Sequence, residues 1–240
     1  MKTVIHKANT RGHANHGWLD AHHTFSFADY YHTDRMHFGV LRVLNDDRIA
    51  PGKGFDTHPH NNMEIITIPL SGDLQHKDSM GNSAVIKTGE IQVMSAGSGI
   101  LHSEFNPNDD QEVSLLQIWV FPHLKDVEPR YDQLSISDIE PKDGLKQILS
   151  PHPDDDGVWI HQNAWFHLGE FDEANANTYI LKEKRNGLYL FVLEGEVFIK
   201  DYKLEKRDGL AITETRKVEF KTGVNTKVLL MEVPMFDIKI

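Results

Sequence analysis

The chain has 240 residues, which is enough for one large domain or two of ordinary size. Hydrophobic residues make up 39% and charged residues 25%, so the chain can pack a core and is not disordered. A net charge of −11 argues against direct binding to nucleic acid. Cysteine is absent, which excludes disulfides, thiolate metal sites and a thiol nucleophile. Any metal must therefore be held by histidine and carboxylate.

The N-terminal sequence, residues 1–20, lacks the apolar stretch of a secretory signal. No apolar run approaches the roughly 20 residues that a membrane-spanning helix needs. We therefore expect a cytoplasmic protein without a membrane partner. All 15 histidines lie between His6 and His167, so any histidine chemistry is expected in that part of the chain.

Short apolar and β-branched runs recur along the chain, separated by clusters of Gly, Asp, Asn and Ser. This pattern predicts an all-β barrel or sandwich. The expected strands are 38–44, 63–70, 84–88, 90–94, 113–120, 188–193, 195–200 and 226–233. The best helix candidate is short, at residues 135–140 before Pro141.

Two stretches, 65–74 and 188–197, each run a hydrophobic strand through a glycine turn into a second strand. Matching Gly72 to Gly195 indicates a duplicated unit of about half the chain. Two unrelated β-domains, or one sandwich with similar hairpins, remain as alternatives. The proline-rich segment 121–157 is the expected linker. The domains are accordingly expected at 1–130 and 131–240.

The first chemical signal is the tripeptide His58-Pro59-His60, of which chance alone predicts about one in this composition. In an extended segment, residues i and i+2 point to one face about 7 Å apart. His102 and Glu104 show the same spacing after a second strand. Paired strands would bring together three imidazoles and one carboxylate, which suits a first-row transition metal with open positions. The alternative is that His102 caps a loop and Glu104 is solvated.

These residues resemble the two cupin motifs. Gly52, His58, His60 and Glu64 match the first motif, and the second is matched, with two extra residues, by Gly89, Gly97, His102 and Asn106. Longer stretches resemble the pirin family of two-domain cupins: 12–31, 41–47, 58–60, 76–82 and 95–104. The resemblance implies two tandem cupin β-barrels with few short helices. It makes 1–130 an N-terminal metal-binding cupin and 131–240 a metal-free one.

The resemblance also implies that His58, His60, His102 and Glu104 hold one divalent metal. Fe(II) is expected first, while Mn, Co, Ni, Cu and Zn suit the same ligands. An ordinary cupin would use Glu64 instead, and strand parity puts Glu64 on the same side as the first two histidines. Glu64 could therefore be a ligand, could orient an imidazole, or could be a polar strand residue. His76 could face the pocket, but a surface histidine beside a turn is the simpler expectation.

The remaining candidates are expected to be structural. They are four histidines of the N-terminal segment, its packing residues, and one tryptophan of the core: His13, His16, His22, His23, Thr24, Phe25, Phe27, Tyr30 and Trp119. In the second half, the Gly72-to-Gly195 match places Leu181 and Glu183 where the first half has His58 and His60. No histidine site is expected there.

Bacterial pirins with this ligand set are associated with quercetin 2,3-dioxygenase activity. The resemblance implies that a flavonol and O2 give a depside and carbon monoxide, with Glu104 as the catalytic proton acceptor. One alternative is a redox-responsive, metal-binding regulator that acts through a protein partner. Another is a cupin isomerase or other small-molecule enzyme. Only an enzyme turns substrate over, and we expect a monomer in each case.

Overall fold

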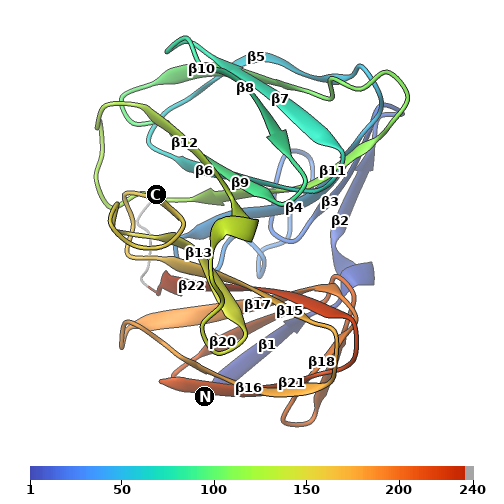
Figure 1. Cartoon of the computed structure of the whole chain (residues 1–240), viewed down its shortest axis with the longest axis vertical. Coiled ribbons are helices and arrows are strands. Elements are labelled where there is room, and N and C mark those ends of the chain that lie inside the picture. The colour runs from blue at the N-terminus through green and yellow to red at the C-terminus, as the bar shows by residue number, and fades with distance from the viewer. Residues whose placement is uncertain (236–240) are drawn as a thin grey trace.

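The computed structural model describes residues 1–235, and nearly all of its regular structure is β-strand. Figure 1 shows two barrels stacked along the long axis of the molecule. Each barrel combines one seven-stranded and one four-stranded sheet. The predicted all-β fold of two tandem cupin barrels is therefore confirmed. Among the described residues, no helix is long and apolar enough to cross a membrane.

The upper barrel in Figure 1 carries the order β12-β9-β6-β11-β4-β3-β2 in one sheet and β5-β10-β7-β8 in the other. Its strands are β2 (Gly12–Asn15), β3 (Leu19–His23), β4 (Leu41–Ile49), β5 (Gly54–His60), β6 (Glu64–Ser71), β7 (Asp73–Asp78), β8 (Ser83–Lys87), β9 (Glu90–Ser95), β10 (Ile100–Phe105), β11 (Val113–Val120) and β12 (Arg130–Ser135).

The lower barrel carries the orders β1-β20-β17-β22-β15-β13-β14 and β16-β21-β18-β19. Its strands are β1 (Lys2–His6), β13 (Leu145–Ser150), β14 (Val158–Trp159), β15 (Trp165–Phe171), β16 (Asn175–Ile180), β17 (Asn186–Glu194), β18 (Glu196–Ile199), β19 (Tyr202–Glu205), β20 (Gly209–Thr213), β21 (Lys217–Thr222) and β22 (Thr226–Pro234).

The two barrels repeat one topology. The run β9-β6-β11-β4 corresponds to β20-β17-β22-β15, and the two four-stranded sheets correspond strand for strand. Gly72 joins β6 to β7 and Gly195 joins β17 to β18, with φ angles of 72° and 73°. Glycine adopts this left-handed conformation without steric cost. The duplication predicted from the Gly72-to-Gly195 match is confirmed.

Two strands cross the expected boundary between residues 130 and 131. β1 pairs along its whole length with β20 of the lower barrel, and His6 Nδ1 lies 2.8 Å from the Tyr189 hydroxyl. β12, from the expected second half, pairs with β9 of the upper barrel. The segment 121–157, expected as a linker, thus contains β12 and β13, which are paired strands of the upper and lower barrel. The helix expected at 135–140 is a 3-10 turn, η2 (Ile136–Asp138), and η1 (Ala8–Thr10) is of the same kind.

The largest apolar cluster lies between the two seven-stranded sheets and holds the barrels together. It includes Ile66 and Ile118 from the upper barrel and Phe166 and Tyr189 from the lower one. Phe25 of the N-terminal segment is buried in it, which confirms its predicted packing role. Half-buried ion pairs reinforce the contact, because Asp46 accepts hydrogen bonds from guanidinium groups of both barrels, Arg11 at 3.1 Å and Arg207 at 2.9 Å.

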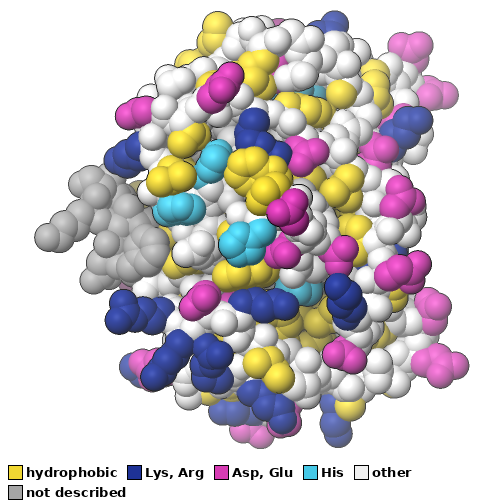
Figure 2. Space-filling model, turned by 60° about the vertical axis from the view of Figure 1, so that its left-hand side comes forward, with side chains coloured by type: hydrophobic (Ala, Val, Ile, Leu, Met, Phe, Trp, Pro, Cys, Tyr) yellow, Lys and Arg dark blue, Asp and Glu magenta, His cyan; other side chains and the backbone are white. Residues whose placement is uncertain are grey.

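The interiors of the barrels differ. A continuous apolar cluster fills the lower barrel. In the upper barrel two smaller clusters lie apart, one around Leu74 and Leu115 and the other around Ile65 and Met94. On the face that Figure 2 shows, acidic and basic side chains are both present, with several histidines at mid-height. The apolar residues are thus gathered into one cluster in the lower barrel and divided between two in the upper one.

The turn at Gly72 gives a test of the fold. A Cβ on Gly72 would crowd the Glu112 carbonyl oxygen at 2.9 Å, whereas one on Gly52, also at positive φ, meets nothing within 4 Å. Both Gly→Ala changes add left-handed strain of about 1–2 kcal/mol. Gly72→Ala should lower the free energy of unfolding by a further amount of about 1–3 kcal/mol, because its Cβ overpacks the turn. Equal losses of unfolding free energy for the two variants in denaturant titrations would contradict this packing.

Candidate metal centre

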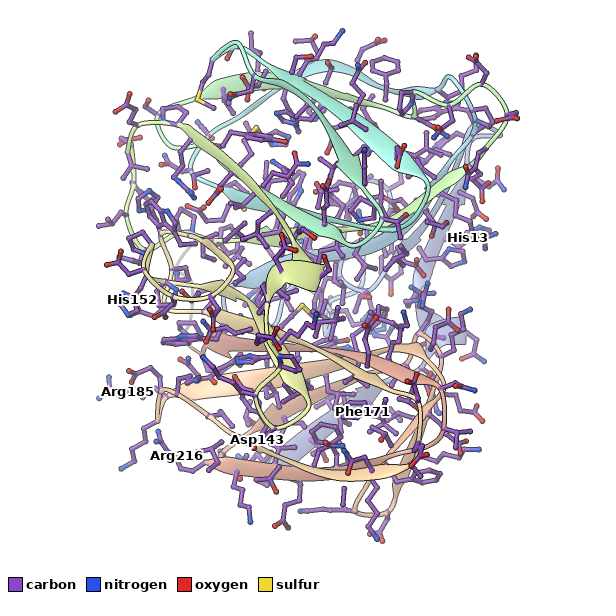
Figure 3. The ribbon with its side chains drawn as sticks, viewed as in Figure 1. His13, Asp143, His152, Phe171, Arg185 and Arg216 are labelled. Carbon is purple, nitrogen blue, oxygen red and sulfur yellow. The ribbon has the colours of Figure 1, made fainter. Side chains whose placement is uncertain are left out.

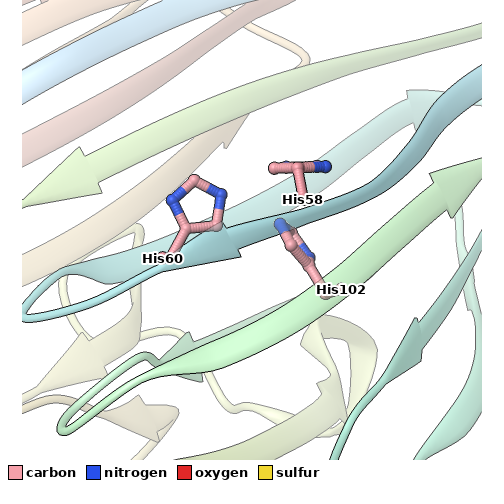
Figure 4. A group of neighbouring side chains, drawn as sticks. All are labelled: His58, His60 and His102. Carbon is pink, nitrogen blue, oxygen red and sulfur yellow. The ribbon is translucent and has the colours of Figure 1, made fainter.

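Three histidines converge inside the upper barrel. β5 and β10 are antiparallel neighbours, and their register places His102 opposite His58 and Ile100 opposite His60. Figure 4 shows the three rings turned toward a common space. Their centroids are 4.4 Å apart for His58 and His102, and 4.9 Å for each of the other two pairs. One nitrogen from each ring lies within 4.8 Å of the others, a group able to hold a metal ion.

Local backbone features make this convergence possible. His58 and His60 share one face of β5 because they are two residues apart. Gly54 begins β5, where a Cβ would overlap the backbone of Glu104 and Phe105 on β10. Only glycine lets the two strands approach so closely there. A register shift between His102 and Glu104 then adjusts the β10 side chains relative to β5.

The chemistry of the rings fits a cation. His102 is buried, and neither of its ring nitrogens has a hydrogen-bond partner within residues 1–235. Burial, followed by the neighbouring histidines, lowers the pKa of His102 to about 2. The same causes lower the pKa of His60 to about 4. Both rings are thus neutral with free lone pairs, and a coordinated metal would satisfy nitrogens that are otherwise costly to bury.

Glu104 lies beside His102 and is held in place from another strand. Gln117 Nε2 on β11 donates to both carboxylate oxygens, at 3.0 and 2.9 Å. Thr67 Oγ1 on β6 lies 3.5 Å from one of them. Burial raises the pKa of this carboxyl group. A carboxylate oxygen is within 4.8 Å of ring nitrogens of His102 and His76, in a second group that shares only His102 with the one formed by the three histidines.

His76 is not the surface residue expected from the sequence. It is 1% exposed and pairs across the strands with Glu104 on β10. Its Nε2 lies 3.2 Å from Asp78 Oδ2, and its ring packs 4.9 Å from Tyr131 of β12. The expectation was wrong because β12, a strand from beyond residue 130, covers this position. His76 is therefore part of the buried polar group around Glu104.

Glu64 does not share a face with the first two histidines. Between β5 and β6 the chain turns at Asn62, whose φ of 47° is left-handed, so strand parity does not continue across it. Glu64 accepts a hydrogen bond from Ser95 Oγ at 2.6 Å. Burial raises its pKa to about 7, against the opposing effects of Ser95 and Arg130. The parity argument was wrong, and Glu64 is a buried polar strand residue outside the histidine cluster.

A cavity of about 460 Å³ opens beside the histidines, within the usual range for small-molecule sites. Trp119, expected in the core, lines it with its ring 4.9 Å from His60. His23, expected to be structural, also lines it and lies 2.9 Å from Asn45 Oδ1. Polar residues that the sequence reading missed complete the wall: Asn45, Asp47 and Gln117. The one sequence feature that could have indicated them is a polar residue at a position of an apolar strand that faces the barrel interior.

The other histidines of the N-terminal segment lie outside the cavity. His13 and His22 stack on neighbouring strands at 4.5 Å, and His13 Nε2 lies 2.6 Å from Asp20 Oδ1. Figure 3 shows His13 at the outer edge of the upper barrel. His16 is exposed. These three residues therefore contribute nothing to the buried cluster.

Comparisons with known proteins agree with this architecture. The pirin family model matches residues 4–120, and the model of the quercetinase C-terminal cupin domain matches residues 147–233. The chain is 41% identical over 230 residues to quercetin 2,3-dioxygenase of Escherichia coli K12, covering 96% of this chain and 98% of that protein. It is 36% identical over 222 residues to a pirin-like protein of Caulobacter vibrioides, covering 92% and 95%.

Solved structures show the same relationship. The crystal structure of YhhW from Escherichia coli aligns with a TM-score of 0.92 at 40% identity, covering 98% of this chain and 99% of that one. The bacterial pirin YhhW in complex with nickel(II) aligns with a TM-score of 0.91 at 39% identity, covering 98% and 100%. Because relatives at 36–41% identity match along nearly their whole length and the pirin model matches residues 4–120, this chain belongs to the pirin family.

Proposed function

We propose that the protein is a metal-dependent dioxygenase that opens a flavonol ring with O2, giving a depside and carbon monoxide. His58, His60, His102 and Glu104 are the proposed metal ligands. The observation that carries this proposal is that His58 and His60 of the histidine cluster, together with Glu104, line a cavity whose walls are largely aromatic and apolar. The relative named quercetin 2,3-dioxygenase supports the reaction class.

The ligand set accepts one divalent transition metal. Fe(II) remains the first expectation, and Mn, Co, Ni, Cu and Zn fit the same donors. Nickel(II) in the related YhhW shows that the pirin scaffold accommodates such an ion in that protein. A metal bound here would supply Lewis acidity toward a substrate oxygen and a place for O2 to react.

The cavity walls suit a flat aromatic substrate. On one side the Trp119 ring meets Phe27 edge to face at 5.4 Å, and Phe27 lies 5.3 Å from His23. On another side Trp18 and Phe55 pack edge to face at 5.3 Å. Burying apolar ring area between such walls contributes roughly 25 cal/mol per Å² of contact. The orientation of the bound substrate must then be set by the few polar groups in the wall.

Glu104 is the proposed proton acceptor for the flavonol 3-hydroxyl group. Its carboxylate is held by Gln117 Nε2, which donates to both oxygens, so it does not need to reorganise when substrate arrives. A buried carboxylate with a raised pKa is a stronger base than a solvated one. Removing the proton leaves an electron-rich flavonolate for O2, and the depside and carbon monoxide together contain all atoms of flavonol and O2.

Monomeric state, cytoplasmic location and the absence of direct nucleic-acid binding stay predictions from the sequence. The regulatory alternative, a redox-responsive metal protein acting through a protein partner, shares the same metal site. It differs in predicting metal binding without consumption of a flavonol.

Replacing Glu104 tests the catalytic role. Glu104→Gln keeps the size of the side chain but removes the base and one of the two oxygens that accept from Gln117 Nε2. O2-dependent loss of quercetin and carbon monoxide release should therefore fall by about 100-fold or more. Glu64→Gln is the matched control, because Glu64 is a buried carboxyl of the same barrel outside the cavity wall. Its rate should remain close to that of the unaltered protein. Full activity in Glu104→Gln would refute the base role.

Metal retention should depend on pH in a window set by the buried rings. Coordination requires neutral imidazole, and the pKa of His60 lies near 4 rather than at the ordinary 6.5. Protons therefore compete for the His60 and His102 rings only below the ordinary histidine range, so metal content should fall toward pH 4. Elemental analysis after dialysis at each pH measures this. The His13→Ala/His22→Ala variant removes two rings of a separate group, His13, Asp20 and His22, that could itself hold a metal ion. It should give the same curve, and metal lost already near pH 7 would contradict the assignment.

A further inference from the structure

One carboxyl group in the cavity wall has no role in the chemistry described so far. Asp47 on β4 is 5% exposed and lines the cavity. Its Oδ1 is buried without a hydrogen-bond partner anywhere in residues 1–235. A second buried carboxyl group in the cavity wall, Glu104, receives two hydrogen bonds from Gln117. A buried polar group left unpaired beside a cavity marks a place where a ligand can complete the hydrogen bonding.

The register of β4 with β11 locates Asp47 relative to the metal centre. Asn45 pairs with Gln117, which holds Glu104, and Asp47 pairs with Leu115 one step further along. Same-face residues along a strand are about 7 Å apart. Asp47 therefore lies about 7 Å beyond the layer that holds Glu104. Its cross-strand neighbour on the other side is Ala21 of β3.

The surroundings of Asp47 are apolar. Leu19, Ile49, Leu74 and Leu115 form one cluster at this end of the barrel, and all four also line the cavity. Burial, together with the charges of Asp46 and Glu104, raises the pKa of Asp47 to about 8. At neutral pH the group is thus mostly a neutral carboxylic acid, which can donate one hydrogen bond and accept another. Such a group complements a phenolic hydroxyl, which also both donates and accepts.

We propose that Asp47 is a specificity-determining residue that hydrogen-bonds a ring hydroxyl at the end of the substrate away from the histidines. The inference rests on the proposed function, which supplies the ligand class. It adds that the cavity selects flavonols that carry a hydroxyl group away from the metal-chelating oxygens. A ligand without that hydroxyl leaves the carboxyl unpaired in an apolar wall. The cost of an unpaired buried group makes this discrimination at least about tenfold in affinity.

Matched flavonols under nitrogen test the proposal without turnover. Galangin and kaempferol differ by the 4′-hydroxyl, and 3-hydroxyflavone and galangin differ by the 5- and 7-hydroxyls. Dissociation constants would be measured with the metal-loaded protein and its Asp47→Leu and Asp47→Asn variants. At least one added-hydroxyl step should tighten binding by about tenfold in the unaltered protein. That gain should fall below about threefold in Asp47→Leu and largely persist in Asp47→Asn, which retains a donor and an acceptor.

The same gain in Asp47→Leu as in the unaltered protein would overturn the proposal, and so would failure of every flavonol to bind the unaltered protein. Asp47→Ala provides a second variant with the same expectation should the leucine variant not fold, with metal content and the far-ultraviolet spectrum as checks. If the binding gain from the added hydroxyl depends on Asp47 but no O2 is consumed, the dioxygenase is refuted and this contact is supported. If flavonols are turned over but Asp47→Leu keeps the full binding gain, the dioxygenase is supported and this contact is refuted.

Discussion

The antiparallel pairing of β5 with β10 is the constraint on which the candidate site depends. It places His58 directly opposite His102, and the period of two along β5 brings His60 to the same face. Gly54 lets the strands approach, and β7 on the other side of β10 brings His76 opposite Glu104. A one-residue slip of this register would turn the β10 side chains to the other face and disperse the cluster.

The two barrels share one topology but differ in the side chains of their interiors. The lower barrel is filled by apolar side chains, and its strands β16 and β21, which correspond to β5 and β10, contain no histidine. The upper barrel leaves a cavity between two apolar clusters and lines it with polar groups. The apolar layer between the seven-stranded sheets fixes the upper barrel against a filled one. Rigid support of this kind suits a site that must keep several ligands in place.

Local patterns predicted much of this structure, and long-range pairing explains the rest. Apolar runs located eight of the 22 strands in residues 1–235, and the i, i+2 histidine spacing predicted the convergence, because both depend only on strand geometry. The place of β1 beside β20 and the burial of His76 beneath Tyr131 depend on partners far along the chain. The parity error at Glu64 came from a single left-handed residue, Asn62, and polar wall residues such as Asp47 show their role only once the barrel is closed.

The most direct measurement is elemental analysis of the untagged protein beside a His58→Ala/His102→Ala variant, followed by O2 uptake with a flavonol panel. The structure predicts about one transition-metal ion per chain, lost in the variant, with uptake only by the metal-loaded protein on flavonols. Metal bound by these histidines without any uptake would contradict the dioxygenase and favour the regulatory alternative. Equal metal content in the two proteins would contradict the metal centre itself.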